Sequence, residues 1–322
     1  MNYSAKEIAK IISEQNDILL LCHIRPDGDT LGSAYGLKYA LEAAGKSVSV
    51  SVADEIAPRL TFIGELEANG RTLKGEKPYI CAIDVARRGM LGANAELDID
   101  MKIDHHERSE EFAPVCLIDP TAAACGEIIY DVIRELEKIG AARLTKASAT
   151  ALFAAISSDT GCFKYSNTSS KTMHIASELI DAGADNYGVN HRLYEIRTKG
   201  ELAARRLMLN ETEYYLDGRV GVLIITADFR QSSGANDDDI GCTVSDIREV
   251  EGVDLAITLK QDIEDRSYFR ISMRSSLSVN ASELCALFGG GGHARAAGAS
   301  VTADSPEAAK KTVLDAVLSQ LK

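Results

Sequence analysis

The chain has 322 residues, of which 45% are hydrophobic and 26% are charged, and its formal net charge is −13. This length accommodates two domains of about 100 to 200 residues, each with its own core. The composition excludes a disordered or low-complexity protein. The acidic charge argues against a protein that coats long nucleic acids, because such binding requires many Lys and Arg side chains to neutralise phosphates. Any nucleotide substrate should be short, with its phosphates held at a local positive site such as bound metal ions.

The N-terminal segment, residues 1–15, alternates charged and apolar residues at helical spacing and lacks the apolar stretch of a signal peptide. No apolar run approaches the roughly 20 residues that a membrane span requires. We therefore expect a cytoplasmic protein without membrane contact. The cysteines form no C-x-x-C pair and show no zinc-ligand spacing, so we expect reduced and mostly buried thiols.

From residue 17 onward, strand-like and helix-like segments alternate. An apolar run at 17–22 is followed by a helical pattern at 31–44 and by a β-branched run at 47–52. Further apolar runs end at Asp84, Asp104 and Asp119, and helices are expected at 126–139, 146–156 and 170–181. This alternation predicts an α/β domain with an open, doubly wound parallel sheet. Ligands of such sheets bind beyond the carboxyl ends of the strands, where these acidic residues lie.

The pattern changes after residue 185. A charged helical stretch at 201–212 leads into strands near 220–226, 255–260 and 269–273, with helices near 281–288 and 306–321. Such a mixture predicts a smaller α+β domain. The expected boundaries are 1–190 for the first domain, 191–204 for a helical linker and 205–322 for the second domain, with a cleft between the two domains.

A cluster of polar side chains directly follows the first buried strand. The segment HIRPDGD contains three potential metal ligands, His23, Asp27 and Asp29. The two aspartates lie on a turn that Pro26 stiffens and Gly28 relaxes, so their carboxylates can point to different ions. The alternative interpretation is an Asx-rich turn that caps the next helix.

A second cluster, Asp104-His105-His106, lies at the end of another strand, and Asp84 and Asp159 also follow apolar runs. A ligand set of four Asp and two or three His favours two divalent ions, Mn²⁺ above all. Imidazole disfavours pure Mg²⁺ or Ca²⁺ sites, and the absence of thiolates disfavours structural zinc. Two ions about 3.5 to 4 Å apart can hold a bridging hydroxide and clamp phosphoryl oxygens during in-line displacement.

The charge that develops on a phosphoryl group requires further donors. A second histidine, Arg274 and the run Gly289–Gly292 before His293 can supply them. Glycines allow backbone amides to approach an anion closely. The same run is also compatible with a loose loop at a helix C-terminus.

Four separated motifs give the chain a specific resemblance: HIRPDGDTLGS (23–33), AIDVA (82–86), DHH (104–106) and SSDTGCFKYSNT (157–168). In this order they resemble the DHH phosphoesterase superfamily. The segments ISMRSS (271–276) and FGGGGHARAAG (288–298) resemble its DHH-associated C-terminal domain. The short, two-domain bacterial nanoRNase and pAp phosphatase type is most similar, whereas RecJ exonucleases are longer.

The resemblance implies a role for each motif residue. A first Mn²⁺ is expected on His23, Asp27 and Asp84, and a second on Asp29, Asp84, His105 and Asp159. Asp84 would bridge both ions, His106 would approach the scissile phosphate, and Asp104 would orient the histidines, as metal-bound imidazoles commonly require. The substrate-binding residues would be Arg274, Ser275, Gly290, Gly291, Gly292 and His293.

The implied activity is that of a hydrolase with two Mn²⁺, for which Mg²⁺ or Co²⁺ can substitute. It would act as an exonuclease that degrades short oligoribonucleotides to mononucleotides, or remove the 3′-phosphate of pAp. A homodimer is an option for its assembly. The alternatives are a phosphodiesterase for pApA or cyclic di-AMP, an inorganic pyrophosphatase, and a catalytically inert nucleotide-binding module. The last predicts the loss of a metal ligand, and none is lost.

Overall fold

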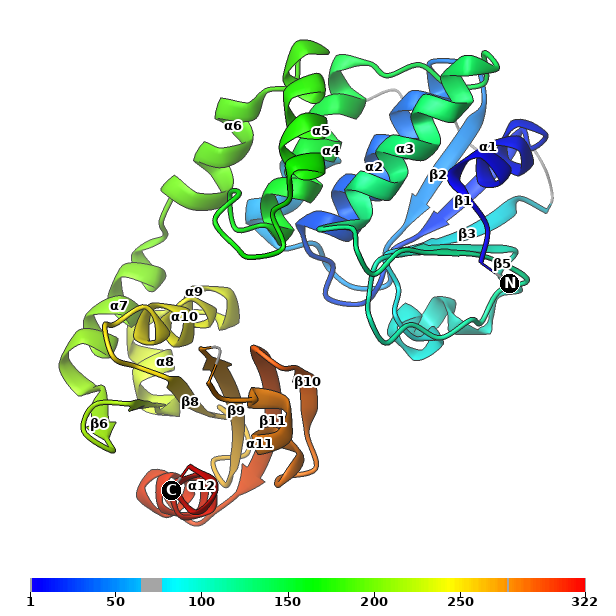
Figure 1. Ribbon diagram of the computed structural model, residues 1–322. Helices are drawn as coiled ribbons and strands as arrows, with labels where there is room; N and C mark the ends of the chain where they lie inside the picture. The colour runs from blue at the N-terminus through cyan, green and yellow to red at the C-terminus, as the bar shows by residue number, and fades with distance from the viewer. Residues whose placement is uncertain (1, 65–76, 277, 322) are drawn as a thin grey trace. The chain divides into compact units, whose positions relative to one another are not determined.

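The computed structural model describes residues 2–64, 77–276 and 278–321. The chain divides into two compact units, Met1–Ile196 and Arg197–Lys322 (Figure 1). The predicted linker, 191–204, spans this division, with a π-helical turn at His191–Glu195 and the start of α7 (Lys199–Glu211). Among the described residues, no helix combines the length and the apolar character needed to cross a membrane.

The first unit contains a five-stranded parallel sheet with the strand order β2-β1-β3-β4-β5. Its strands are β1 (Asp17–Leu21), β2 (Ser47–Ser51), β3 (Tyr79–Ile83), β4 (Met101–Asp104) and β5 (Val115–Ile118). The predicted open parallel sheet is confirmed. The strand order reverses between β1 and β3, and ligands of such sheets bind beyond the carboxyl ends at the point of reversal. The topology therefore places a site at the ends of these two strands.

Both faces of this sheet are covered, but by different kinds of element. Alternate residues of β1 point to opposite faces, with Leu20 in the core beneath the helices and Leu21 in a smaller cluster with Leu91 of the 3₁₀ segment η2 (Arg88–Glu96). Figure 1 shows α2, α3 and α4 packed together over the first face. The helices are α1 (Ala5–Ser13), α2 (Gly28–Glu42), α3 (Cys125–Lys138), α4 (Lys146–Asp159), α5 (Ser170–Asp181) and α6 (Asn186–Asn190). A further 3₁₀ segment, η1, spans Pro58–Ile63.

Glycines let α2 approach α4 closely. They recur every four residues on one side of α2, at Gly28, Gly32 and Gly36. A Cβ atom added at Gly32 would lie 2.4 Å from the carbonyl oxygen of Ala151 and 2.7 Å from the amide nitrogen of Ala155. This packing holds the first turn of α2 against the last turn of α4. It thereby brings together two segments that carry predicted metal ligands.

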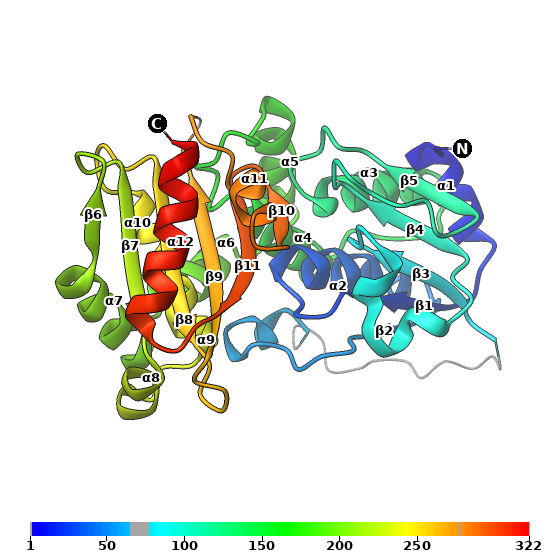
Figure 2. The same ribbon diagram turned by 90° about the horizontal axis from the view of Figure 1, so that it is seen from below.

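The second unit contains a six-stranded mixed sheet with the order β10-β11-β9-β8-β7-β6. Only β7 and β8 are parallel to each other. Figure 2 shows α12 lying over this sheet, where it packs on residues such as Leu255 and Ile257, while α7 and α10 pack on the other face against residues such as Leu223. The elements are β6 (Glu213–Tyr215), β7 (Val220–Ile225), α8 (Ala227–Ser233), α9 (Asp237–Gly241), α10 (Thr243–Arg248), β8 (Leu255–Gln261), β9 (Tyr268–Ser275), α11 (Ala281–Ala286), β10 (Gly291–His293), β11 (Ala296–Thr302) and α12 (Pro306–Gln320).

The short strand β6 was not foreseen from the sequence, and neither were β10 and β11, the two strands at the opposite edge of the sheet. The residues of β10 and β11 are mainly Gly and Ala, which have a low intrinsic preference for strands. They form because β11 pairs with all but the last residue of β9 and β10 then adds to its free edge. Tertiary pairing therefore overrides local propensity here.

We predict that Gly32→Ala destabilises the protein by about 1–3 kcal/mol, because the added methyl group meets backbone atoms of α4 that cannot move aside. The free energy of unfolding in urea measures this effect. Gly89→Ala is the control, since a Cβ there meets nothing within 4 Å. Equal stability of both variants would show that the two helices do not constrain each other.

Candidate metal centre

The loop after β1 agrees with both interpretations that the sequence allowed, a helix cap and a group of potential metal ligands. Asp27 is the N-cap of α2, and its Oδ1 accepts hydrogen bonds from the amides of Asp29 and Thr30, both at 3.0 Å. The same Oδ1 lies 3.6 Å from Nε2 of His23. Arg25, between them, has a left-handed backbone with φ 51°. Capping and a place in the polar cluster are thus compatible for Asp27.

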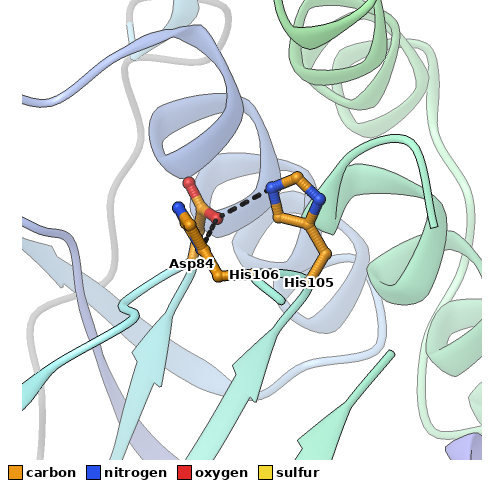
Figure 3. Close-up of side chains that lie close together, drawn as sticks. All are labelled: Asp84, His105 and His106. Atoms are coloured by element: carbon orange, nitrogen blue, oxygen red, sulfur yellow. Dashed lines mark ion pairs between the residues drawn. The ribbon is translucent and has the colours of Figure 1, made fainter. Parts of the chain in front are cut away.

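Asp84 lies at the centre of the cluster. It follows β3 with a left-handed φ of 59°, a strained conformation for a residue other than glycine, and its side chain is 2% exposed. Its Oδ2 lies 3.7 Å from Nε2 of His23. Its Oδ1 lies 3.6 Å from Nε2 of His105, and Figure 3 shows this pair. The described residues provide no hydrogen-bond partner for Oδ1, although it is buried. The two oxygens therefore face two different imidazoles.

Around the second imidazole, Asp29 and Asp159 complete a group. Nε2 of His105 lies 3.5 Å from Oδ2 of Asp29 and 3.4 Å from Oδ2 of Asp159. The N-terminus of α3 holds Asp29 in place, since the amides of Cys125 and Gly126 donate to its carboxylate at 2.6 and 3.0 Å. No sequence motif indicated this support, because the two segments are almost one hundred residues apart.

Backbone carbonyls determine which ring nitrogen of two histidines faces the carboxylates. Nδ1 of His23 lies 2.7 Å from the carbonyl oxygen of Ile24, and Nδ1 of His105 lies 3.2 Å from that of Ala122. Because a carbonyl only accepts, each Nδ1 carries the proton, and Nε2 of the neutral ring presents a lone pair. These lone pairs face carboxylate oxygens at 3.4 to 3.7 Å. Such an arrangement is repulsive unless a metal ion or a second proton on the ring lies between the groups.

The spacing of these atoms fits metal ligands. Atoms bound about 2.0–2.2 Å from one ion lie about 3.0–3.6 Å from one another. One group of potential ligand atoms comes from His23, Asp27 and Asp84, and a second from Asp29, His105 and Asp159. A third group, Asp84 with His105 and His106, overlaps these two. The structure therefore brings together every residue that the resemblance assigns to metal, and Asp84 faces both groups.

His106 is oriented differently from His105. Its Nδ1 lies 2.7 Å from Oδ1 of Asp104 and 3.6 Å from Oδ1 of Asp84. The shorter contact is a hydrogen bond, so Nδ1 donates its proton to Asp104. Oδ1 of Asp104 also accepts from the amide of His105 at 2.9 Å. Asp104 thus holds both histidines of the motif.

Burial and mutual repulsion dominate the electrostatics of the cluster. Burial, followed by the charge of Asp29, raises the pKa of Asp84 well above its usual value. Burial likewise raises the pKa of Asp29 and of Asp159. Burial lowers the pKa of His23, but its interactions with the carboxylates of Asp27 and Asp84 outweigh burial and raise the pKa to about 11, so without metal this ring carries a second proton on Nε2. A divalent cation would relieve the repulsion and displace these protons.

The residues predicted to bind substrate lie at one edge of the second unit's sheet. Ala296 of β11 pairs with Arg274 of β9 on one side and with His293 of β10 on the other. The hydroxyl of Ser275 donates to the carbonyl of Ala294 at 3.0 Å.

The four-glycine run is divided between two structures. The amides of Gly289 and Gly290 donate to the carbonyls of Ala286 and Cys285 at 3.1 and 3.0 Å, which closes the C-terminus of α11. The remaining two glycines begin β10. The amide of Gly290 is therefore engaged within the protein and does not face an anion.

Comparison with known proteins identifies the family. The DHH family N-terminal domain matches residues 17–156, and the DHHA1 domain matches residues 218–322. The bifunctional oligoribonuclease and PAP phosphatase NrnA of Thermus thermophilus is 30% identical over 321 residues, which cover 98% of this chain and 93% of that protein. The chain belongs to the DHH phosphoesterase family. The resemblance stated from the four motifs is confirmed.

Further relatives extend this family assignment. The protein of the same name from Bacillus subtilis is 27% identical, with 92% of each chain covered. The crystal structure of an exopolyphosphatase-related protein from Bacteroides fragilis superposes with a TM-score of 0.87 at 22% identity, covering 98% of this chain and 97% of that one. This structure shares the fold of the chain.

We predict that Asp84→Asn stabilises the metal-free protein at neutral pH. Because folding raises the pKa of Asp84, its contribution to stability is present at low pH and is lost as the pH rises through the raised value. The increase in the free energy of unfolding that Asp84→Asn produces should be small near about pH 4 and should grow with pH. Urea unfolding with a chelator, at several pH values, measures it.

The same variant should abolish the stabilisation that added Mn²⁺ gives the wild type. Asp131→Asn is the control, because Asp131 is 40% exposed and pairs with Lys171 on the surface. If the stability that Asp84→Asn adds to the metal-free protein decreased with rising pH, the result would contradict the electrostatic account of the cluster.

Proposed function

We propose that this protein is a phosphohydrolase with two Mn²⁺ that degrades short oligoribonucleotides to mononucleotides and removes the 3′-phosphate of pAp. The observation that carries the proposal is the position of Asp84, whose two oxygens face the two ligand groups at 3.7 and 3.6 Å. The names of its relatives, oligoribonuclease and PAP phosphatase, support the substrate class.

His23, Asp27 and Asp84 would hold the first ion, and Asp29, Asp84, His105 and Asp159 the second. Carboxylates mixed with imidazoles favour Mn²⁺ over Mg²⁺, and the lack of thiolates in both groups disfavours structural zinc. When bound, two such ions supply an activated hydroxide and neutralise the charge of the phosphoryl oxygens. The protein's part is to keep the carboxylates ionised and correctly spaced.

His106 is the protein group that we assign to the phosphoryl group. Its Nδ1 contacts Asp104 at 2.7 Å, so we assign the opposite ring nitrogen, Nε2, to the substrate. A protonated Nε2 donates a hydrogen bond to a phosphoryl oxygen or a proton to the leaving oxygen. Asp104 stabilises that protonated ring, since its carboxylate lies at the opposite nitrogen.

Arg274 and His293 would bind the rest of the nucleotide. Residues paired across a sheet project to the same face, so both side chains flank the small Ala296. Two residues along β11, Gly298 lies between Gly291 and Ser272 on that same face. These small residues form a flat surface beside the guanidinium of Arg274. Such a surface suits a ribose and its phosphate.

The substrate class is tested with the purified chain and Mn²⁺, by comparing a diribonucleotide, pAp, pApA and pyrophosphate side by side. We expect mononucleotides from the diribonucleotide and phosphate from pAp, with Asp84→Asn inactive as the control for contaminating nucleases. Activity confined to pyrophosphate would contradict the proposal. A clear preference for pApA would favour the diesterase alternative.

For Arg274→Ala we predict a KM for the diribonucleotide raised about 10- to 100-fold, the size of a lost hydrogen bond to a charged group. The metal content by elemental analysis should be unchanged. Arg266→Ala is the matched control, because Arg266 pairs with Asp228 on the surface of the same unit at 2.8 Å. Loss of metal from Arg274→Ala would contradict the division of roles between the two units.

A further inference from the structure

A lysine is buried directly behind the DHH motif. Lys102 lies on β4, two residues before Asp104, and both side chains are 0% exposed. Met101 and Ile103 of the same strand point into the core beneath the helices, so Lys102 and Asp104 project to the opposite face. Lysine is almost never fully buried unless its charge is paired. Its presence here requires a specific reason.

All three ammonium protons of Lys102 are used. Nζ donates to the hydroxyl of Ser109 at 2.5 Å, to the carbonyl of Glu110 at 2.7 Å and to the carbonyl of Ala86 at 3.2 Å. It also lies 3.3 Å from Oδ2 of Asp104.

These contacts join two loops of the candidate metal centre. Ala86 follows Asp84 by two residues, and Ser109 and Glu110 follow His106. The amide of Glu110 donates to the same Ala86 carbonyl at 2.8 Å. Lys102 therefore connects the loop that carries the central carboxylate to the loop that carries both histidines.

The same lysine provides the positive charge next to Asp104. Oδ2 of that carboxylate accepts from Ser109 and faces Lys102, while Oδ1 accepts from Nδ1 of His106. An ionised carboxylate in this position accepts a hydrogen bond from Nδ1 of His106 and cannot donate one.

We propose that Lys102 is a positioning residue that acts through Asp104 to keep a proton on Nδ1 of His106, so that Nε2 faces the substrate and can take up the second proton that it donates to a phosphoryl oxygen. The last step rests on the proposed function. Free histidine in water favours the tautomer with its proton on Nε2, so the protein must impose the Nδ1–H form. The described polar contacts of Lys102 include none of the predicted ligand atoms.

The chain offers a matched control at Lys46. This lysine is 8% exposed, and its Nζ donates to the carbonyl of Ser13 at 2.9 Å and to that of Gln15, near the amino end of β1. Lys46→Met removes a buried ammonium that caps carbonyls, as Lys102→Met does, but at the opposite end of the sheet from the metal centre. Any effect of lost stability alone should appear in both variants.

The experiment measures the tautomer of His106 in the metal-free protein by nitrogen-15 NMR of the imidazole ring, and kcat for a diribonucleotide with Mn²⁺. The wild type and Lys46→Met should show the Nδ1–H form. Lys102→Met should lose that form, with kcat lowered about 10- to 100-fold and KM changed less. Lys102→Arg, which keeps the charge, should restore the Nδ1–H form in part.

Two results would overturn the proposal: an Nε2–H form of His106 in the wild type, or an unchanged Nδ1–H form in Lys102→Met. If Lys102→Met does not fold, Lys102→Gln keeps a donor for the carbonyls without the charge, and the wild-type spectrum still tests the assignment. Failure of the wild type to hydrolyse any nucleotide would refute the proposed function but leave the NMR result standing.

Discussion

The arrangement of the candidate metal centre depends on one buried carboxylate. Asp84 leaves β3 in a left-handed conformation, and this turn directs its two oxygens toward His23 on one side and His105 on the other. The reversal of strand order between β1 and β3 makes the position available. The left-handed backbone is an unfavourable conformation that the surrounding structure stabilises, as is common at functional sites.

The buried carboxylates of the metal centre lower the stability of the metal-free protein, and the same property favours the binding of metal. Several carboxylates with raised pKa values lie together in a buried region, which disfavours the metal-free folded state at neutral pH. Rigid elements hold them there: the N-terminus of α3 binds Asp29, and the close approach of α2 to α4 keeps Asp29 near Asp159. Because these elements hold the carboxylates together, a divalent cation that relieves their repulsion is bound favourably.

The two units contain different kinds of sheet, and each kind favours a different type of site. The first uses a parallel sheet, whose strands all end at one edge and so collect ligands from distant segments. The second uses a largely antiparallel edge, where small residues such as Ala296 and Gly298 leave space beside Arg274. The first arrangement suits polar chemistry in a buried place, and the second suits recognition of a nucleotide over an open face.

The sequence by itself determined the fold class, most strands and helices, the family and the residues of the candidate site, because apolar periodicity and motif order are local properties. It did not reveal β6, nor the Gly- and Ala-rich strands β10 and β11, of which β11 forms by pairing with β9 and β10 by pairing with β11. It also missed Lys102 and the α3 amides that hold Asp29. Only the tertiary structure decided these features, since they depend on contacts between segments far apart in the chain. The tertiary structure also decided the geometry of Asp84, because the two imidazoles that it faces follow other strands.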